Sequence, residues 1–308
     1  MKRYIAESSL LLNTIIWGAT FILIKNALIF VSPMTFISLR FSVATLILIP
    51  FLFKILKQIN KSLLFGGLLL GFLYFAGFAT QTAGLKFTSA TKSGFITGTF
   101  VVFTPLFQLL IEKRRPSLIN ILGIILVISG LLFLSTGGTS LTDFFNEIGN
   151  DFNLGDFLTL LCAVFFALYL VYLDIISKKF DFFPLVFIQI AFTGVGGIFL
   201  LLLFQISGIE QIKFSINGQV IFAVIYTSLL ATILTTFLQT KYQKFVTPTK
   251  AGIIFSLEPI FAALFAFFLV NEKISNFGII GCGFIFCGLL ITEVFDNKKK
   301  EAGFTETG

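Results

Sequence analysis

The sequence predicts an all-α integral membrane protein with ten transmembrane helices, arranged as two five-helix repeats of inverted topology. Three observations predict this fold class: the composition, the spacing of the apolar runs and an internal repeat. Of the 308 residues, 56% are hydrophobic and only 12% are charged, and the mean hydropathy is +1.00. A soluble domain has about a quarter charged residues and too little interior to cover so much apolar surface.

The apolar runs define the expected helices. A span needs about 20 apolar residues, and its backbone groups must be satisfied within the segment, so each run is expected to be helical. Ten runs meet this requirement: 8–29, 33–53, 63–85, 93–111, 117–136, 155–176, 183–204, 219–240, 250–270 and 276–295.

The connections between these runs are short except for one. In the segment 137–153, apolar residues recur at helical spacing (Leu141, Phe144, Phe145 and Ile148), and acidic residues lie between them. A short interfacial helix and a solvated acidic loop are both open for it. After Asn297 the chain is polar, and we expect a mobile cytoplasmic tail over 296–308.

Lysine and arginine set the orientation. With a cytoplasmic N-terminus, 16 of the 22 basic residues fall in inside segments, four fall in outside segments, and Lys25 and Arg40 lie within helices. This bias predicts a multi-pass protein of the inner (cytoplasmic) membrane with both termini in the cytoplasm. Because the net charge of +7 is spread in these short clusters, it indicates orientation in a lipid bilayer and not nucleic-acid binding.

An internal repeat divides the chain. Eight of 16 positions agree between 81–96 (QTAGLKFTSATKSGFI) and 239–254 (QTKYQKFVTPTKAGII), including Gln, Thr, Lys and Gly in register. We therefore expect a first repeat at 8–136, an outer connecting loop at 137–153 and a second repeat at 154–295. Five helices are an odd number, so the second repeat enters the membrane inverted. Such repeats are typical of secondary transporters that bind substrate between the halves.

The five-plus-five layout and several local features carry a family resemblance. The features are Trp17-Gly18, Arg40, the Thr-x-x-Gly entries at Thr91 and Thr249, Glu258-Pro259, and the acidic ends Glu112 and Glu272. With them the sequence resembles the drug/metabolite transporter superfamily, specifically proteins with two EamA-type domains. The pattern often places Gly before each acidic end, where this chain has Ile111 and Asn271.

The resemblance implies a secondary-active or facilitative exporter of small metabolites, such as amino acids, that works by alternating access. Drug or cation efflux and exchange of sugar phosphates or nucleotide sugars are the alternatives that it leaves open. The partners expected are a small-molecule substrate and the bilayer, with a proton as one candidate coupling ion. A channel or a sensor subunit is the alternative from a different class.

The residue types in the sequence give little support for an enzymatic function. The chain has no His, and its three Cys fall in apolar runs without metal-ligand spacing. We expect no enzyme activity, no cofactor and no metal. An intramembrane enzyme would need a nucleophile with a base, a metal cluster or paired carboxylates at membrane depth.

Two charges at membrane depth are the main candidates for a substrate site. Arg40 is expected about 10 Å into the second span and Glu258 near the midplane of the ninth. Their repeat mates are Ala191 and Phe100, so neither charge belongs to the shared scaffold. Arg40 could hold an anionic group or reach to the interface. Glu258 could take a proton, meet a substrate ammonium group, pair with Arg40 or fix helix packing.

Polar and small residues complete the set of candidates. Trp17, Thr97 and Thr104 are expected at the cavity, with core packing or backbone bonding as alternatives. Lys92 and Lys250 are repeat mates that could be interface anchors or matched gates. Close helix packing or kinks are expected at six further positions: Gly94, Gly98, Pro105, Gly252, Ser256 and Pro259.

Overall fold

A computed structural model describes residues 2–56, 58–135, 142, 152–270 and 276–305. These residues are helical except for short connections and an isolated bridge between Val31 and Phe214. Eight segments are long and apolar enough to cross a membrane. Two shorter apolar helices, Leu118–Leu134 and Asn276–Thr292, occupy the fifth and tenth predicted positions. The predicted all-α membrane class is confirmed.

The first half contains the helices of the first five predicted spans. They are α1 (Lys2–Gly18), α2 (Thr20–Ala27), α3 (Pro33–Leu48), the short η1 (Ile49–Phe51), α4 (Leu52–Leu56), α5 (Lys61–Phe87), α6 (Ala90–Gly98), α7 (Phe100–Glu112) and α8 (Leu118–Ser135). The segment 137–153 lies outside the described residues, apart from positions 142, 152 and 153.

The second half repeats this order. Its helices are α10 (Leu154–Ser177), α11 (Phe182–Ser207), α12 (Gly218–Ser228), the π-helical η2 (Leu229–Leu234), α13 (Thr235–Tyr242), η3 (Gln243–Phe245), α14 (Pro248–Phe255), α15 (Glu258–Val270) and α16 (Asn276–Thr305). The backbone of α16 continues as helix to Thr305, beyond the span end expected at 295. Glu272 lies outside the described residues.

The fourth and ninth spans are interrupted at equivalent points. The backbone N–H of Thr99 donates to the carbonyl of Ile96, and that of Leu257 donates to Ile254, both at 3.1 Å. These three-residue bonds tighten the helix and separate α6 from α7 and α14 from α15. Pro259 contributes to the second break because it has no N–H to donate. Pro105, by contrast, lies inside α7, and the helix is not interrupted there. The break in the fourth span is at Thr99, six residues before the proline at which a kink was expected.

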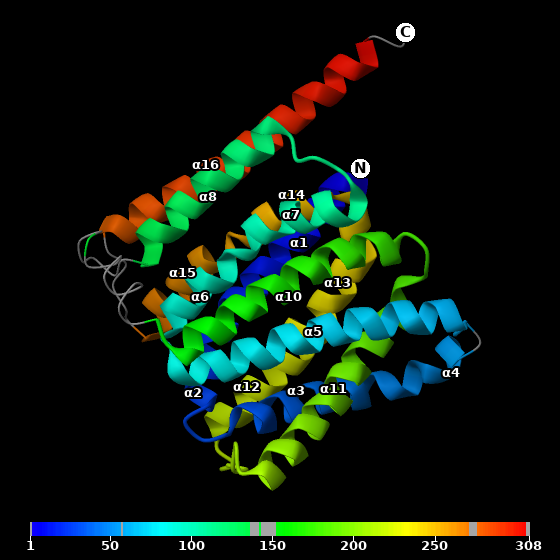
Figure 1. The fold of residues 1–308 in the computed structure, drawn as a ribbon, viewed down its shortest axis with the longest axis vertical. Helices are drawn as coiled ribbons and strands as arrows, with labels where there is room; N and C mark the ends of the chain where they lie inside the picture. The colour runs from blue at the N-terminus through cyan, green and yellow to red at the C-terminus, as the bar shows by residue number, and fades with distance from the viewer. Residues whose placement is uncertain (1, 57, 136–141, 143–151, 271–275, 306–308) are drawn as a thin grey trace.

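Contacts between glycines show that equivalent helices run in opposite directions. A side chain at Gly130 would meet the carbonyl oxygen of Gly281 at 2.6 Å, and one at Gly123 would meet that of Gly288 at 3.1 Å. Residue numbers therefore increase along α8 in the direction in which they decrease along α16, and the two helices are antiparallel neighbours (Figure 1). Because α8 and α16 are repeat mates, this packing is the inverted arrangement that the odd helix number predicts.

The remaining helices pack with the same symmetry. Helix α10 contacts α5 and α7, and its repeat mate α1 contacts α13 and α15, which are the mates of α5 and α7. In Figure 1, α1 and α10 both run through the middle of the bundle. The two halves are therefore interleaved, and each contributes helices to both sides of the centre.

Candidate functional site

A cavity of about 50 Å³ lies between the two halves. Its lining is aromatic and neutral polar, with one aliphatic and one acidic side chain. The lining residues are Trp17, Thr20, Tyr74, Phe78, Gln81, Thr97, Phe100, Phe166, Tyr169, Leu170, Gln239, Phe255 and Glu258.

The cavity is built from equivalent positions in the two halves. An offset of 149 pairs Trp17 of α1 with Phe166 of α10, and Thr20 of α2 with Tyr169 of α10. In later helices, the offset of 158 seen in the sequence pairs Gln81 with Gln239, Thr97 with Phe255, and Phe100 with Glu258. All of these residues line the cavity. The scaffold around the cavity is therefore symmetric, whereas its chemistry is not.

Glu258 supplies the carboxylate of the cavity. It is the first residue of α15, where the positive end of the helix dipole stabilises a negative charge. Among the described residues, no side chain forms a hydrogen bond or an ion pair with it. Gly18 brings α1 close to this point, because a Cβ there would lie 2.6 Å from Cβ of Phe261. Glu258 and Trp17 both line the cavity.

Arg40 lies behind the cavity wall and does not line it. Its side chain is 1% exposed, and the guanidinium lies 4.5 Å from the ring centre of Phe78. Nε donates to Thr232 Oγ1 at 2.8 Å, and Nη2 donates to the carbonyl of Ala231 at 2.9 Å. The structure therefore contains neither the ion pair with Glu258 nor the interfacial position that the sequence left open.

The partners of Arg40 belong to the π-helical turn Leu229–Leu234. A π-turn leaves carbonyl groups outside the regular helix ladder. The carbonyl of Ala231 also accepts the indole N–H of Trp17 at 3.3 Å, and Thr235 Oγ1 lies 3.2 Å from the same nitrogen. Arg40 and Trp17 thus share an acceptor, and the carbonyl of Ala231 links the buried charge to a ring in the cavity wall.

The threonine and serine candidates divide between the cavity and the backbone. Thr97 lines the cavity, and its Oγ1 lies 3.4 Å from Nε2 of Gln81. Thr104 donates to the carbonyl of Phe100 at 2.7 Å, and Ser256 donates to that of Gly252 at 2.9 Å. The last two hydroxyls satisfy their own helices, which for Thr104 is the alternative that the sequence left open.

The glycine candidates have different surroundings. Gly98 faces Leu131, whose side chain would lie 3.0 Å from an added Cβ, so α6 approaches α8 closely there. A Cβ at Gly252 would meet Phe100 and Thr104 only at ordinary contact distance, 3.7 Å. At Gly94 nothing lies within 4 Å, and close helix approach does not explain this glycine.

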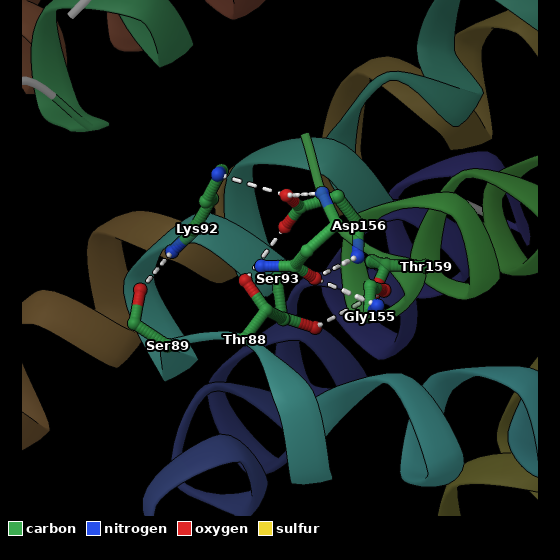
Figure 2. Close-up of polar contacts among 8 residues, drawn as sticks. Thr88, Ser89, Lys92, Ser93, Gly155, Asp156 and Thr159 are labelled. Carbon is green, nitrogen blue, oxygen red and sulfur yellow. Dashed lines mark hydrogen bonds and ion pairs between the residues drawn. The ribbon is translucent and has the colours of Figure 1, made fainter. Parts of the chain in front are cut away.

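Lys92 joins the start of α6 to the start of α10 (Figure 2). Its Nζ lies 2.8 Å from Oδ2 of Asp156, whose side chain is completely buried. The same carboxylate accepts from Thr88 Oγ1 at 2.7 Å and from the backbone N–H of Asn153 at 3.0 Å. This network joins the ends of α5, α6 and α10.

Lys250 makes the equivalent contact at the other end of the bundle. Its Nζ lies 2.8 Å from Oε1 of Glu7, and the lysine side chain is 4% exposed. Glu7 also accepts from Nε of Arg3 at 2.6 Å. The offset of 149 relates Glu7 to Asp156, so the two ion pairs are symmetry mates. In Figure 1, α14 lies beside the N-terminus and α6 lies at the opposite end.

Comparison with known proteins agrees with this architecture. The model of the EamA-like transporter family matches residues 5–136 and 153–294. The chain belongs to the EamA-like transporter family. The two matched segments correspond to the two halves described above.

Relatives of this EamA-like protein include two uncharacterized transporters of Archaeoglobus fulgidus. One is 33% identical over 96% of this chain and 87% of its own length, and the other is 27% identical over 92% and 95%. The uncharacterized transporter YoaV of Bacillus subtilis is 22% identical over 93% and 96%. A crystal structure aligns with a TM-score of 0.73 at 15% identity, over 96% of this chain and 99% of that one, and supports the fold.

Several residues of this EamA-like site escaped the sequence reasoning. Among 43 Phe residues, no pattern singled out Phe78, Phe100, Phe166 or Phe255 as cavity residues. Tyr74 and Tyr169 carried a usable signal, because the chain has only six Tyr and these two lie mid-span. The acidic partners Glu7 and Asp156 were also missed. An alignment of the first helix of each half pairs these two acidic residues at an offset of 149.

Proposed function

We propose that this EamA-like protein is an alternating-access transporter that exports small metabolites, such as amino acids or related compounds, through the central cavity. The observation that carries the proposal is that equivalent positions of both halves line one cavity, with equivalent ion pairs beyond its two ends. An inverted pair of halves can exchange conformations, and the exchange moves the opening from one membrane face to the other.

The two ion pairs fit the role of gates. Five residues, about 7.5 Å along the helix, separate Lys92 from the cavity residue Thr97, and the same interval separates Lys250 from Phe255. Each pair joins a helix of one half to a helix of the other half. Breaking one pair while the other holds would open the cavity toward one side only.

The direction of these openings follows from the orientation proposed for the inner membrane. With both termini in the cytoplasm, Lys250 and Glu7 face the cytoplasm, whereas Lys92 and Asp156 face the outside. Export is supported by the resemblance to EamA-type exporters. Transport would follow a substrate gradient or a proton gradient, with Glu258 as the carboxylate that could take up the proton.

Other functions are less well supported. In the described residues, no group of three or more His, Cys, Asp or Glu could hold a metal ion, and the cavity offers Glu258 without a second carboxylate for paired acid–base chemistry. A channel favours repeated identical rings, whereas here Phe100 stands opposite Glu258 in the repeat. Sugar phosphates would need a cation in the cavity wall, and none of the lining residues is basic.

Reconstitution tests the proposal. Purified protein in liposomes that are loaded with a cellular metabolite mixture should release a subset of the compounds, in the absence of ATP. Liposomes with the doubly crosslinked protein, in which both ion pairs are replaced by linked cysteines, are the matched control. Release equal to that control, a requirement for ATP or large single-channel currents would contradict the proposal.

A further inference from the structure

The charged side chains in and around the cavity differ in whether they have hydrogen-bond or ion-pair partners. Glu258 is the one charged residue among the thirteen that line the cavity, and no hydrogen bond or ion pair reaches it from the described residues. Two buried basic side chains of the bundle have other partners. Arg40 binds Thr232 and Ala231 behind Phe78, and Lys250 pairs with Glu7.

An isolated carboxylate at membrane depth is costly unless something compensates its charge. Since Glu258 begins α15, the helix dipole provides part of this compensation. A bound proton or a positively charged group of a bound molecule would supply the remainder.

The other walls also suit a cation. The ring centroids of Trp17 and Phe255 lie 5.1 Å apart, and those of Tyr74 and Tyr169 lie 5.2 Å apart. Aromatic faces attract ammonium groups, and the attraction grows when water is excluded. Rings in this number also offer flat apolar surface to a hydrophobic group.

The neutral polar groups give little support to an anion. The indole N–H of Trp17 already faces Ala231 and Thr235, and the hydroxyl of Thr20 donates to the carbonyl of Trp17 at 2.7 Å. By contrast, Oε1 of Gln239 is a buried acceptor without a partner among the described residues. Gln239 therefore offers an acceptor to a ligand.

On the basis of the transport function proposed above, we propose that the cavity selects a small aromatic or aliphatic amine with a net positive charge, whose ammonium group binds Glu258. A free amino acid carries a carboxylate that the lining residues do not match. Between compounds of the same shape, the amine should bind more tightly than the amino acid. The amino acid in turn should bind more tightly than the acid without an amino group.

A series of four compounds tests this order: phenethylamine, phenylalanine, 3-phenylpropionate and 2-phenylethanol. Binding is measured on the purified protein through the fluorescence of Trp17, the only Trp in the chain, and checked by thermal shift. We expect the amine to bind at least about tenfold more tightly than the alcohol, as one charge-assisted contact provides. Equal binding of all four, or a preference for the acid, would overturn the proposal.

Variants of Glu258 test whether this residue determines the preference for the amine. Glu258→Gln should remove the preference of amine over alcohol, and Glu258→Asp should retain part of it. Glu112→Gln is the control, because Glu112 lies at the end of α7, bonds Gln108 and does not line the cavity. Since no described side chain depends on Glu258, the Gln variant should keep the thermal stability of the parent. Unchanged amine preference in a folded Gln variant would overturn the assignment.

The outcomes separate this inference from the transport proposal. If the cavity alternates between the two membrane faces but binds no amine, the substrate class is wrong and the transport function stands. If amines bind at Glu258 but the cavity never changes sides, the ligand class stands and transport fails.

Discussion

The ammonium group of Lys250 lies 2.8 Å from the carboxylate of Glu7, and this contact joins the start of α14 to α1. Lys92 and Asp156 repeat the contact, at the same distance, between α6 and α10. Neither pair is held within one helix, unlike the pair of Lys178 and Asp174 on a single stretch of chain. Each therefore ties together two helices that an opening motion would separate.

The ion pair at α6 should be sensitive to charge reversal. We expect Lys92→Asp or Asp156→Lys alone to abolish most transport, because each leaves like charges facing one another in a buried position. The exchanged double variant should recover transport, with a coupling energy of about 1–3 kcal/mol in stability. Lys86→Ala, at an exposed lysine near the end of α5, is the control and should have little effect. Additive losses in the double variant would show that the pair does not act as a unit.

Arg40 should act through Trp17. In Arg40→Met, the hydroxyl of Thr232 loses its donor and the carbonyl of Ala231 loses one of its two donors, at about 1.5–3 kcal/mol for each hydrogen bond to a charged group. We expect a lower melting temperature and a shift of the Trp17 emission spectrum. Arg115→Met, in the loop before α8, is the control. An unchanged emission spectrum together with full transport would exclude the positioning role.

The glycines between α8 and α16 should be intolerant of larger side chains. Gly130→Val would place atoms against the carbonyl of Gly281, and we expect a loss of about 1–3 kcal/mol in stability. At Gly283, on the same pair of helices, an added Cβ meets nothing within 4 Å. The Gly283→Val variant should therefore melt like the parent. Equal losses at both positions would contradict the antiparallel packing described for these helices.

The membrane orientation has its own test. Single cysteines in a cysteine-free background should react with an impermeant reagent from outside when placed at Asp143, and not when placed at Lys57 or Arg114. The reason is the distribution of lysine and arginine between the two faces. Reaction of Lys57→Cys or Arg114→Cys from outside would reverse the assignment of the gates to the two sides.

The sequence was sufficient for the fold because the repeat retained polar residues in register. Matching Gln, Thr, Lys and Gly at an offset of 158 implied an inverted second half, and the antiparallel contacts of Gly123 and Gly130 agree with it. The site was only partly predictable. Glu258, Trp17 and Thr97 stood out as unusual residues at membrane depth, and the structure places all three in the cavity wall.

Arg40 shows why the rest was missed. Its depth was predictable from its place in the second span, but its partners are a hydroxyl and a carbonyl on a π-helical turn, 192 and 191 residues away. Nothing in a linear sequence marks a carbonyl that a π-turn leaves free. The phenylalanines of the cavity were missed for a different reason, since they are too frequent in this chain to be distinguished from core residues.

Locking the two ion pairs one at a time tests alternating access most directly. In a background without native cysteines, Thr97→Cys marks the cavity, and a short bifunctional thiol reagent links either Lys92→Cys with Asp156→Cys or Lys250→Cys with Glu7→Cys. With the first link closed, the marker should react with an impermeant probe only from the cytoplasmic side. With the second link closed, it should react only from outside. Reaction from the same side in both locked forms would contradict the account.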